Sequence, residues 1–528
     1  MSADSDDMVG ESSETEMDAE LEAAERARSG EQIEFYGGKW MSALPLFVFV
    51  VWAIFQSGVL GIGDTTGLVI AMLVGLIIGM LFVKGDWENY ANTIFEGMTR
   101  RVAATAVVAW LWAGMFANTL QAGGFVDGLV WAADALSIGA TLFPAATFLL
   151  AALLATGIGT GYGTAVTFVT LFFPVGVLLG ASPVLTFGAI LSGAVFGDNL
   201  APVSDTTIVS AVTQDSDIGG VVASRFKYAI IAAIPALALY VLAGGTMGSP
   251  FAVGGNAQTL LVENSQPLGL VHLLSIGVVI GTAVQGRHIV EAISWGLIVT
   301  IVLSLLLGLA SASAVLVFQA PQSSGIAQSL SVLPIVEVVP RADAAIGGSL
   351  YDGAVGFFPL IVLTLLIVAG AQIMIRGGAF DALQDWLLGS FATSLRRAEL
   401  TMVLGTAGVN AMITINTAAE IAIGPYIARM GERFNINGYR RANILDANTS
   451  ALGYIFPWGG GVLAGYAAML TLPGEYEWFT QAMIVNPAQV WPFVFQGWLL
   501  FFVFIVAAAT GFGLEYTSDR EAKEVARV

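Results

Sequence analysis

The feature that most constrains this chain is a series of apolar stretches, each about as long as a membrane-spanning helix. Crossing the hydrocarbon core of a bilayer takes ~20 mostly apolar residues. Ten stretches qualify, at 40–57, 66–83, 102–122, 186–212, 228–244, 268–284, 293–312, 354–375, 442–470 and 489–513. Only 11% of the residues are charged, against about 25% in soluble domains. We therefore predict an all-α polytopic membrane protein with about ten spanning helices.

Two further apolar stretches, 141–181 and 400–433, are interrupted in their middle by small polar residues. The first interruption is Thr156-Gly-Ile-Gly-Thr-Gly-Tyr-Gly-Thr164 and the second is Asn410-Ala-Met-Ile-Thr-Ile-Asn-Thr417. The arms of the first stretch would make helices of only ~22–25 Å at 1.5 Å per residue, which is short for a ~30 Å core. We therefore predict two re-entrant hairpins, each leaving the membrane on the side where it entered.

The same order of predicted elements occurs in both halves of the chain. In each half a hairpin precedes an interrupted span, 186–212 in the first and 442–470 in the second. Matching positions, 248 to 254 residues apart, are Thr160 and Thr414, Pro174 and Pro425, and Asp198 and Asp446. If the N-terminal tail is cytoplasmic, every lysine and arginine except Arg341 lies on the cytoplasmic side, with Arg225 in a loop. Opposed repeats with interrupted helices are typical of secondary transporters.

The predicted organisation has five parts. They are an acidic disordered cytoplasmic tail (1–38), a first membrane repeat (39–245), a linker with two spans and extracellular loops (246–350), a second membrane repeat (351–513) and a cytoplasmic tail (514–528). The first 34 residues carry twelve acids and two arginines, a charge density that favours disorder. Four lysines against sixteen arginines, with acidic ends, indicate the surface of a salt-tolerant protein from a halophile.

The main candidate site is the run Gly197-Asp-Asn-Leu-Ala-Pro-Val-Ser-Asp-Thr-Thr207 inside an apolar segment. An ionised aspartate within a membrane is costly and usually functional, and Pro202 removes a backbone donor and breaks the helix. Carboxylate, hydroxyl and amide oxygens suit Na+, and the same carboxylate can hold a proton instead. We predict Asp205 as the main ion ligand and Asp198 as its partner. The alternative is that Ser204 or Asp205 merely caps a helix at the membrane surface.

This stretch resembles the signature of NhaC-type sodium/proton antiporters, in which a GD pair is followed by a proline and an SDTT run. The glycine- and threonine-rich run 156–164 is similar to the first hairpin tip of that family. The resemblance extends from about Trp40 to Phe512. It implies sodium-for-proton exchange, the hairpin and broken-helix fold of the ion transporter superfamily, and a homodimer.

The second half resembles the family less closely. Where the family has an LEDSGT run and then PWN, this chain has Leu445-Asp446-Ala447-Asn448-Thr449 and then Pro457-Trp458-Gly459. The resemblance assigns family motif positions to Asp446, Thr449 and Trp458 only. Leu445 replaces the glutamate of the family, which would leave one buried carboxylate fewer and one ion fewer per cycle.

The complete set of predicted ion-binding residues comes from four places. These are Asp198, Asn199, Ser204, Asp205, Thr206 and Thr207; Thr156, Thr160 and Thr164; Asn416, Thr417 and Glu420; and Asp446, Asn448 and Thr449, with Na+ itself held by Asp205, Ser204 and Asp198. The alternative for Glu420 is an ion pair with Arg429 at the cytoplasmic end of the hairpin. His288, beside Arg287, is interpreted as an interfacial residue rather than a pH sensor.

The predicted function is secondary antiport, exporting Na+ in exchange for H+ by alternating access in the cell membrane. It needs no cofactor; its partners are small cations and lipids, and no nucleic acid. The alternative is a sodium- or proton-coupled exchanger of organic anions such as malate or lactate. An anion site would usually need a helix N-terminus or a buried arginine near the breaks. The sequence places the nearest arginines at loop ends, which favours the cation exchanger. A channel, a membrane sensor or an enzyme is less favoured, because polarity gathers at the breaks and no nucleophile–base pair is visible.

Overall fold

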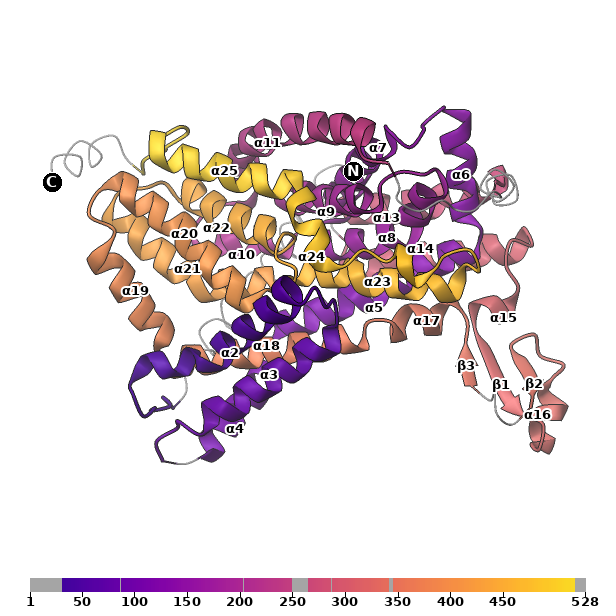
Figure 1. Cartoon of the computed structure of the whole chain (residues 1–528), viewed down its shortest axis with the longest axis horizontal. Coiled ribbons are helices and arrows are strands. Elements are labelled where there is room, and N and C mark those ends of the chain that lie inside the picture. Colours follow the sequence, from indigo (N-terminus) through magenta and orange to yellow (C-terminus); the bar gives the residue numbers. More distant parts are fainter. Residues whose placement is uncertain are drawn as a thin grey trace, which may run out of the picture.

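The computed structural model describes residues 31–85, 87–202, 204–248, 265–285, 287–340 and 345–517. Within them the chain is helical apart from one small sheet (Figure 1). By length and composition, eight helices of this described part could cross a membrane, and shorter apolar helices lie at Thr65–Met80, Phe143–Ile158 and Pro267–Ala283. Most of the predicted acidic tail, the last eleven residues and Arg341 lie outside the described residues.

Helices cover each predicted apolar stretch. Before the first hairpin they are η1 (Lys39–Ala43), α2 (Leu44–Ala53), η2 (Ile54–Val59), α3 (Thr65–Met80), α4 (Trp87–Met98), α5 (Arg101–Ala122) and α6 (Phe125–Ala135). Between the first interrupted span and the second hairpin they are α11 (Ile218–Thr246), η3 (Pro267–His272), α13 (Leu273–Val284), α14 (Ile289–Leu306), α17 (Ser349–Val355), α18 (Phe358–Arg376) and α19 (Ala379–Ser390). The C-terminal helices are η5 (Gln481–Met483), α24 (Pro487–Val490), η6 (Trp491–Phe493) and α25 (Phe495–Thr510).

Both predicted hairpins are pairs of helices joined by a two-residue tip. The first is α7 (Phe143–Ile158) and α8 (Gly161–Leu178), and the second is α20 (Leu395–Ile413) and α21 (Asn416–Arg433). Each tip begins with a residue of left-handed backbone, Gly159 at φ 80° and Thr414 at φ 60°, a conformation that ends a helix. The second helices of the two hairpins begin 255 positions apart.

Both predicted interrupted spans are also present. The first is α9 (Pro183–Leu200) followed by α10 (Asp205–Thr213), and the second is α22 (Gly438–Leu452) followed by α23 (Gly460–Glu475). Pro202 lies in the first break, where the chain cannot continue the helical hydrogen bonds. Their starting residues, Pro183 with Gly438 and Asp205 with Gly460, are again 255 positions apart.

Helix α8 lies at the centre of the molecule, and all of its residues are buried. It packs against α5, α9 and α23. Its partner α7 packs closely along α9. The two backbones are so near at Gly193 that a Cβ atom there would lie 2.8 Å from the backbone oxygen of Phe148. The helices of the first hairpin and the first interrupted span therefore form one tightly packed unit.

A three-stranded sheet lies in the predicted linker and was not expected from the sequence. Its strands are β1 (Val317–Pro321), β2 (Val336–Val339) and β3 (Ala345–Gly347), in the order β2-β1-β3, with β1 parallel to β2 and antiparallel to β3. The short helices α15 (Ala312–Val315) and α16 (Gly325–Leu330) accompany it. Figure 1 shows this unit at one end of the molecule, away from α20, α21 and α22.

Candidate ion-binding site

Asp198 stands where the first hairpin tip and both helix breaks meet. It lies near the end of α9, with 3% of its surface exposed. Ser204 donates a hydrogen bond of 2.8 Å to its Oδ1, and Tyr454, from the second break, donates one of 3.2 Å to its Oδ2. A Cβ atom at Gly161, the first residue of α8, would lie 3.0 Å from Oδ2. The carboxylate is therefore enclosed by three segments, two of which supply a hydroxyl group.

Asp205 is the first residue of α10 and bonds across to the other half of the chain. Thr417, near the start of α21, donates a hydrogen bond of 2.7 Å to its Oδ2. The hydroxyl groups of its neighbours Ser204 and Thr206 lie beside Asp198 instead. Their two oxygen atoms are 3.0 Å apart. Ser204 is the N-cap of α10 by position, yet its hydroxyl makes no capping bond in the described structure. Ser204, with Thr206 bonded to it, thus serves Asp198 rather than Asp205.

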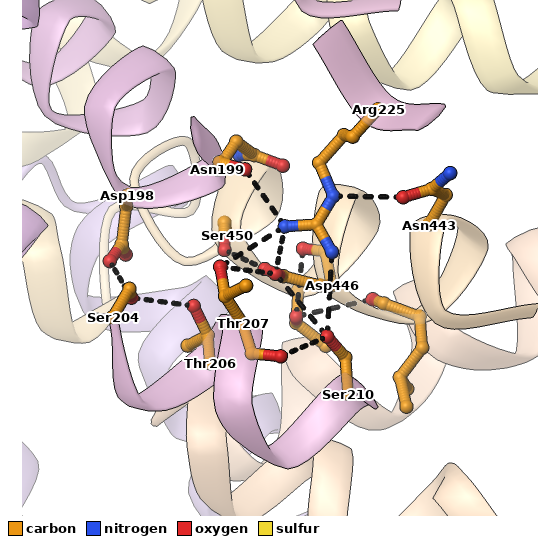
Figure 2. A network of polar contacts seen from close by, with 12 residues as sticks. Asp198, Asn199, Ser204, Thr206, Thr207, Ser210, Arg225, Asn443, Asp446 and Ser450 are labelled. Carbon is orange, nitrogen blue, oxygen red and sulfur yellow. Dashed lines mark hydrogen bonds and ion pairs between the residues drawn. The ribbon is translucent and has the colours of Figure 1, made fainter. Parts of the chain in front are cut away.

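Asp446 and Arg225 form an ion pair, and both side chains are completely buried. The sequence placed Arg225 in a cytoplasmic loop, and that prediction is wrong. Helix α11 begins at Ile218, ten residues before the predicted span. The longer helix carries Arg225 inward against α22, which bears Asp446 (Figure 2).

Further polar groups surround this ion pair. Thr207 of α10 donates a hydrogen bond of 3.2 Å to Oδ2 of Asp446, and Ser450 donates one of 2.7 Å to Oδ1. Asn443 accepts from Nε of Arg225 at 3.0 Å. Asn443 and Ser450 were not predicted as site residues, although spacings of three and four residues around Asp446 place all three on one face of a helix.

Glu420 is fully buried in α21, inside the molecule. Thr449 of α22 donates a hydrogen bond of 2.6 Å to its Oε1. Its Oε2 has no hydrogen-bond partner among the described residues. The alternative of an ion pair with Arg429 is therefore not what the structure shows. Thr449 also donates to the backbone oxygen of Leu445 at 3.2 Å, so the Glu420 carboxylate lies beside the turn of α22 between Leu445 and Thr449.

Several buried amide oxygens near the tips and breaks lack partners. Within the described part of the chain these are Oδ1 of Asn199, Asn410, Asn416 and Asn448. The backbone N–H of Asn416 donates to the hydroxyl of Tyr162 at 3.2 Å, and its side chain packs against Gly453 in the second break. A buried oxygen without a partner costs about 1–3 kcal/mol. Such oxygens are the neutral ligands that a dehydrated monovalent cation would use.

The predicted threonines of the first hairpin use their hydroxyl groups locally. Thr160 caps α8 by accepting from the N–H of Gly163 at 3.2 Å. Thr164 donates to the backbone oxygen of Thr160 at 2.9 Å, and Thr156 donates to that of Ala152 at 2.8 Å. These bonds shape the hairpin tip. In the structure described, none of the three hydroxyls is hydrogen-bonded to a carboxylate.

The chemistry of the site is that of a cation site built from oxygen atoms. Four carboxylates meet here. Those of Asp198, Glu420 and Asp446 are buried and that of Asp205 is partly exposed. The side-chain hydrogen bonds that Asp198, Asp205 and Glu420 accept come from uncharged hydroxyl groups. No group of three or more histidine, aspartate or glutamate side chains suitable for a metal ion occurs in the ranges that the structure covers. Carboxylates with hydroxyl neighbours can hold a proton or, when ionised, a monovalent cation.

Apolar helices with carboxylates buried where two interrupted helices meet define a multi-pass membrane transporter rather than an enzyme. The match to the Na+/H+ antiporter family model over residues 32–221 and 211–498 shows that the chain belongs to this family. The resemblance to NhaC-type antiporters is thereby confirmed.

Relatives in the family have different transported solutes in their names. The arginine/ornithine antiporter ArcD of Halobacterium salinarum is 22% identical over 81% of this chain and 87% of its own length. The malate-2H(+)/Na(+)-lactate antiporter of Bacillus subtilis is 29% identical over 34% of this chain and 36% of its own. The Na(+)/H(+) antiporter NhaC of Alkalihalophilus pseudofirmus is 24% identical over 26% and 29%.

Among solved structures, the YdaH transporter of Alcanivorax borkumensis is similar, with a TM-score of 0.41 and 14% identity over 89% of this chain and 99% of that one. MtrF of Neisseria gonorrhoeae has a TM-score of 0.39 and 11% identity over 87% and 97%.

Proposed function

We propose that this protein exports Na+ in exchange for H+ by alternating access. The observation that carries the proposal is the bond from Thr417 to Asp205, which joins the first interrupted helix to the tip of the second hairpin. A partly exposed carboxylate at that junction can hold a proton or, once deprotonated, a Na+ ion. Because both ions need the same oxygen atoms, binding of one releases the other. Exchange follows when the site opens to each side of the membrane in turn.

We also propose that Asp198 shares this role and that uncharged oxygens complete the coordination. Asp198 has two hydroxyl donors, from Ser204 and Tyr454. A bound Na+ would take the place of these hydrogen atoms and use the hydroxyl oxygens as ligands. The two aspartates lie on either side of the break after α9, so their proton affinities are coupled.

We infer that the two hairpins are re-entrant and that 39–245 and 351–513 are inverted repeats. The common spacing of 255 residues between helix starts supports this proposal, as does the complete burial of α8, which keeps that arm away from lipid. We further propose a homodimer in the cell membrane with both termini in the cytoplasm.

A second candidate function is exchange of charged organic solutes such as arginine and ornithine. The similarity to ArcD over most of both chains favours it. Buried carboxylates would equally receive the cationic groups of arginine or ornithine.

Transport by purified protein in liposomes separates these functions. Vesicles containing a pH dye receive Na+, Li+, K+, malate, arginine or ornithine outside. Na+/H+ exchange predicts that external Na+ makes the interior more alkaline, and that Asp205→Asn abolishes this response. A response to arginine or malate without a response to Na+ would instead establish the second candidate.

A further inference from the structure

The side chain of Arg225 is completely enclosed by acceptors of the protein itself. Its Nε donates to Asn443, one terminal nitrogen donates to Asp446, to the backbone oxygen of Asn199 at 2.8 Å and to Thr207 at 3.3 Å, and the other donates to Ser210 at 3.4 Å. These acceptors come from α9, α10 and α22, and Figure 2 shows the guanidinium between them. Every nitrogen atom of the guanidinium is therefore already engaged.

This enclosure argues against Arg225 as an anchor for a transported anion. An anion would have to displace Asp446, which is itself negatively charged and fixed by three hydroxyl groups, those of Thr207, Ser210 and Ser450. Separating a buried ion pair leaves two uncompensated charges, which is strongly unfavourable. The pair is therefore a stable part of the site.

Asp446 differs in this respect from the other three carboxylates of the site. Asp198, Asp205 and Glu420 accept hydrogen bonds from hydroxyl groups, which a cation can replace. Asp446 is bonded to a permanent positive charge, since arginine stays protonated in proteins. The guanidinium of Arg225, a cation that belongs to the protein itself, thus already occupies this carboxylate.

We propose that Arg225 is a tethered counter-ion that keeps Asp446 from binding the transported cation and thereby sets how many cations the site takes. This proposal rests on the proposed cation exchange. It assigns Asp446, predicted from the sequence as an ion ligand, to positioning: the ion pair holds α10 and the end of α9 against α22. Cation binding is then left to Asp198, Asp205 and Glu420.

The decisive variant removes both charges at once, Arg225→Gln with Asp446→Asn. Glutamine and asparagine can still hydrogen-bond to each other, and replacing both partners of a buried ion pair by neutral groups is often tolerated. The number of Na+ ions bound per protomer is measured with radioactive Na+ on purified protein. A number equal to that of the wild type supports the proposal. A loss of one bound ion overturns it, because Asp446 would then have been a ligand.

The single variant Arg225→Gln gives the opposite test. It uncovers Asp446, so we expect one additional Na+ ion per protomer and a steeper dependence of transport on Na+ concentration. The control Arg225→Lys retains the charge and should bind the wild-type number of ions. A folded Arg225→Gln protein with an unchanged number of ions would contradict the proposal.

Failure of the proposed function is recognised separately. If the wild type neither binds nor exchanges Na+, sodium exchange is wrong. The same comparison of wild type and double variant is then made with radioactive arginine, measuring the number of molecules bound. An equal number in both proteins would still support the masking of Asp446, and a lower number in the double variant would overturn it.

Discussion

Thr417 provides the most direct test of the site at the scale of single residues. Its hydroxyl group is the side-chain donor to Asp205, over 2.7 Å. Thr417→Val should weaken the apparent affinity for Na+ about tenfold, because it removes a ligand oxygen worth about 1–1.5 kcal/mol. The measurement is the Na+ concentration that gives half-maximal exchange in liposomes. Thr417→Ser retains the hydroxyl and serves as the control; equal affinities of Thr417→Val and wild type would contradict the role of this oxygen.

The sequence predicted most of the residues gathered at the breaks, yet not how they pair. Successive residues of a helix point about 100° apart, so the hydroxyls of one short run cannot all face the same carboxylate. Ser204 therefore turns to Asp198, and Thr207 turns to Asp446. Tyr454 could not be predicted, because a tyrosine in an apolar segment usually serves packing. Its contact with Asp198 depends on how the two halves fold together.

At the scale of single elements, the two hairpin tips differ in the residue that takes the left-handed conformation. Gly159 adopts it without cost, whereas for Thr414 it costs about 1–2 kcal/mol. Gly159→Ala should therefore destabilise the protein by about 1 kcal/mol, and Thr414→Gly should leave stability unchanged or slightly higher. Melting temperatures in detergent test this expectation. If Thr414→Gly melted well below the wild type, the strain at this tip would be disproved.

The start of α8 allows a second test on this scale. A Cβ atom at Gly161 would meet Tyr454 and Asp198, so Gly161→Ala should lower the affinity for Na+ and destabilise the protein by about 1–3 kcal/mol. Gly277 in α13 is the matched control, because a Cβ atom there meets nothing within 4 Å. Gly277→Ala should retain wild-type exchange. Full exchange activity in Gly161→Ala would show that this close approach is not needed.

Hydrophobicity and chain breaks predicted the long apolar helices, the tips and the breaks, but not α4, α6 and α19, which lie outside the predicted apolar stretches. Apolar length located the helices, and glycine, proline and small polar residues located the tips and the breaks. The sheet at 317–347 was not predicted, because its strands have only three to five residues and are too short to show an alternating pattern. The start of α11 was also not predicted. A charged residue ordinarily ends a predicted span, so Arg225 was assigned to a loop.

For the whole molecule, the proposed inverted arrangement predicts on which side each loop lies. The chain contains no cysteine, so a single introduced cysteine can be labelled without background. Ser331→Cys, in the loop region of the sheet, should react with a membrane-impermeant maleimide added outside intact cells. Thr393→Cys, before α20, should react only after the membrane is opened. Both positions are exposed in the structure, so labelling of both from outside would contradict the topology.

The spacing of 255 residues between equivalent helices also suggests how the site of such a transporter can change while its fold is retained. Two helix pairs and two interrupted helices have the same layout in both halves, yet Gly159 corresponds to Thr414 and Gly161 to Asn416. The backbone plan thus tolerates unlike side chains at equivalent points. Evolution can exchange the chemistry of one tip while its counterpart maintains the architecture. That freedom offers a physical reason why one family has members named for amino acids, for carboxylic acids and for sodium.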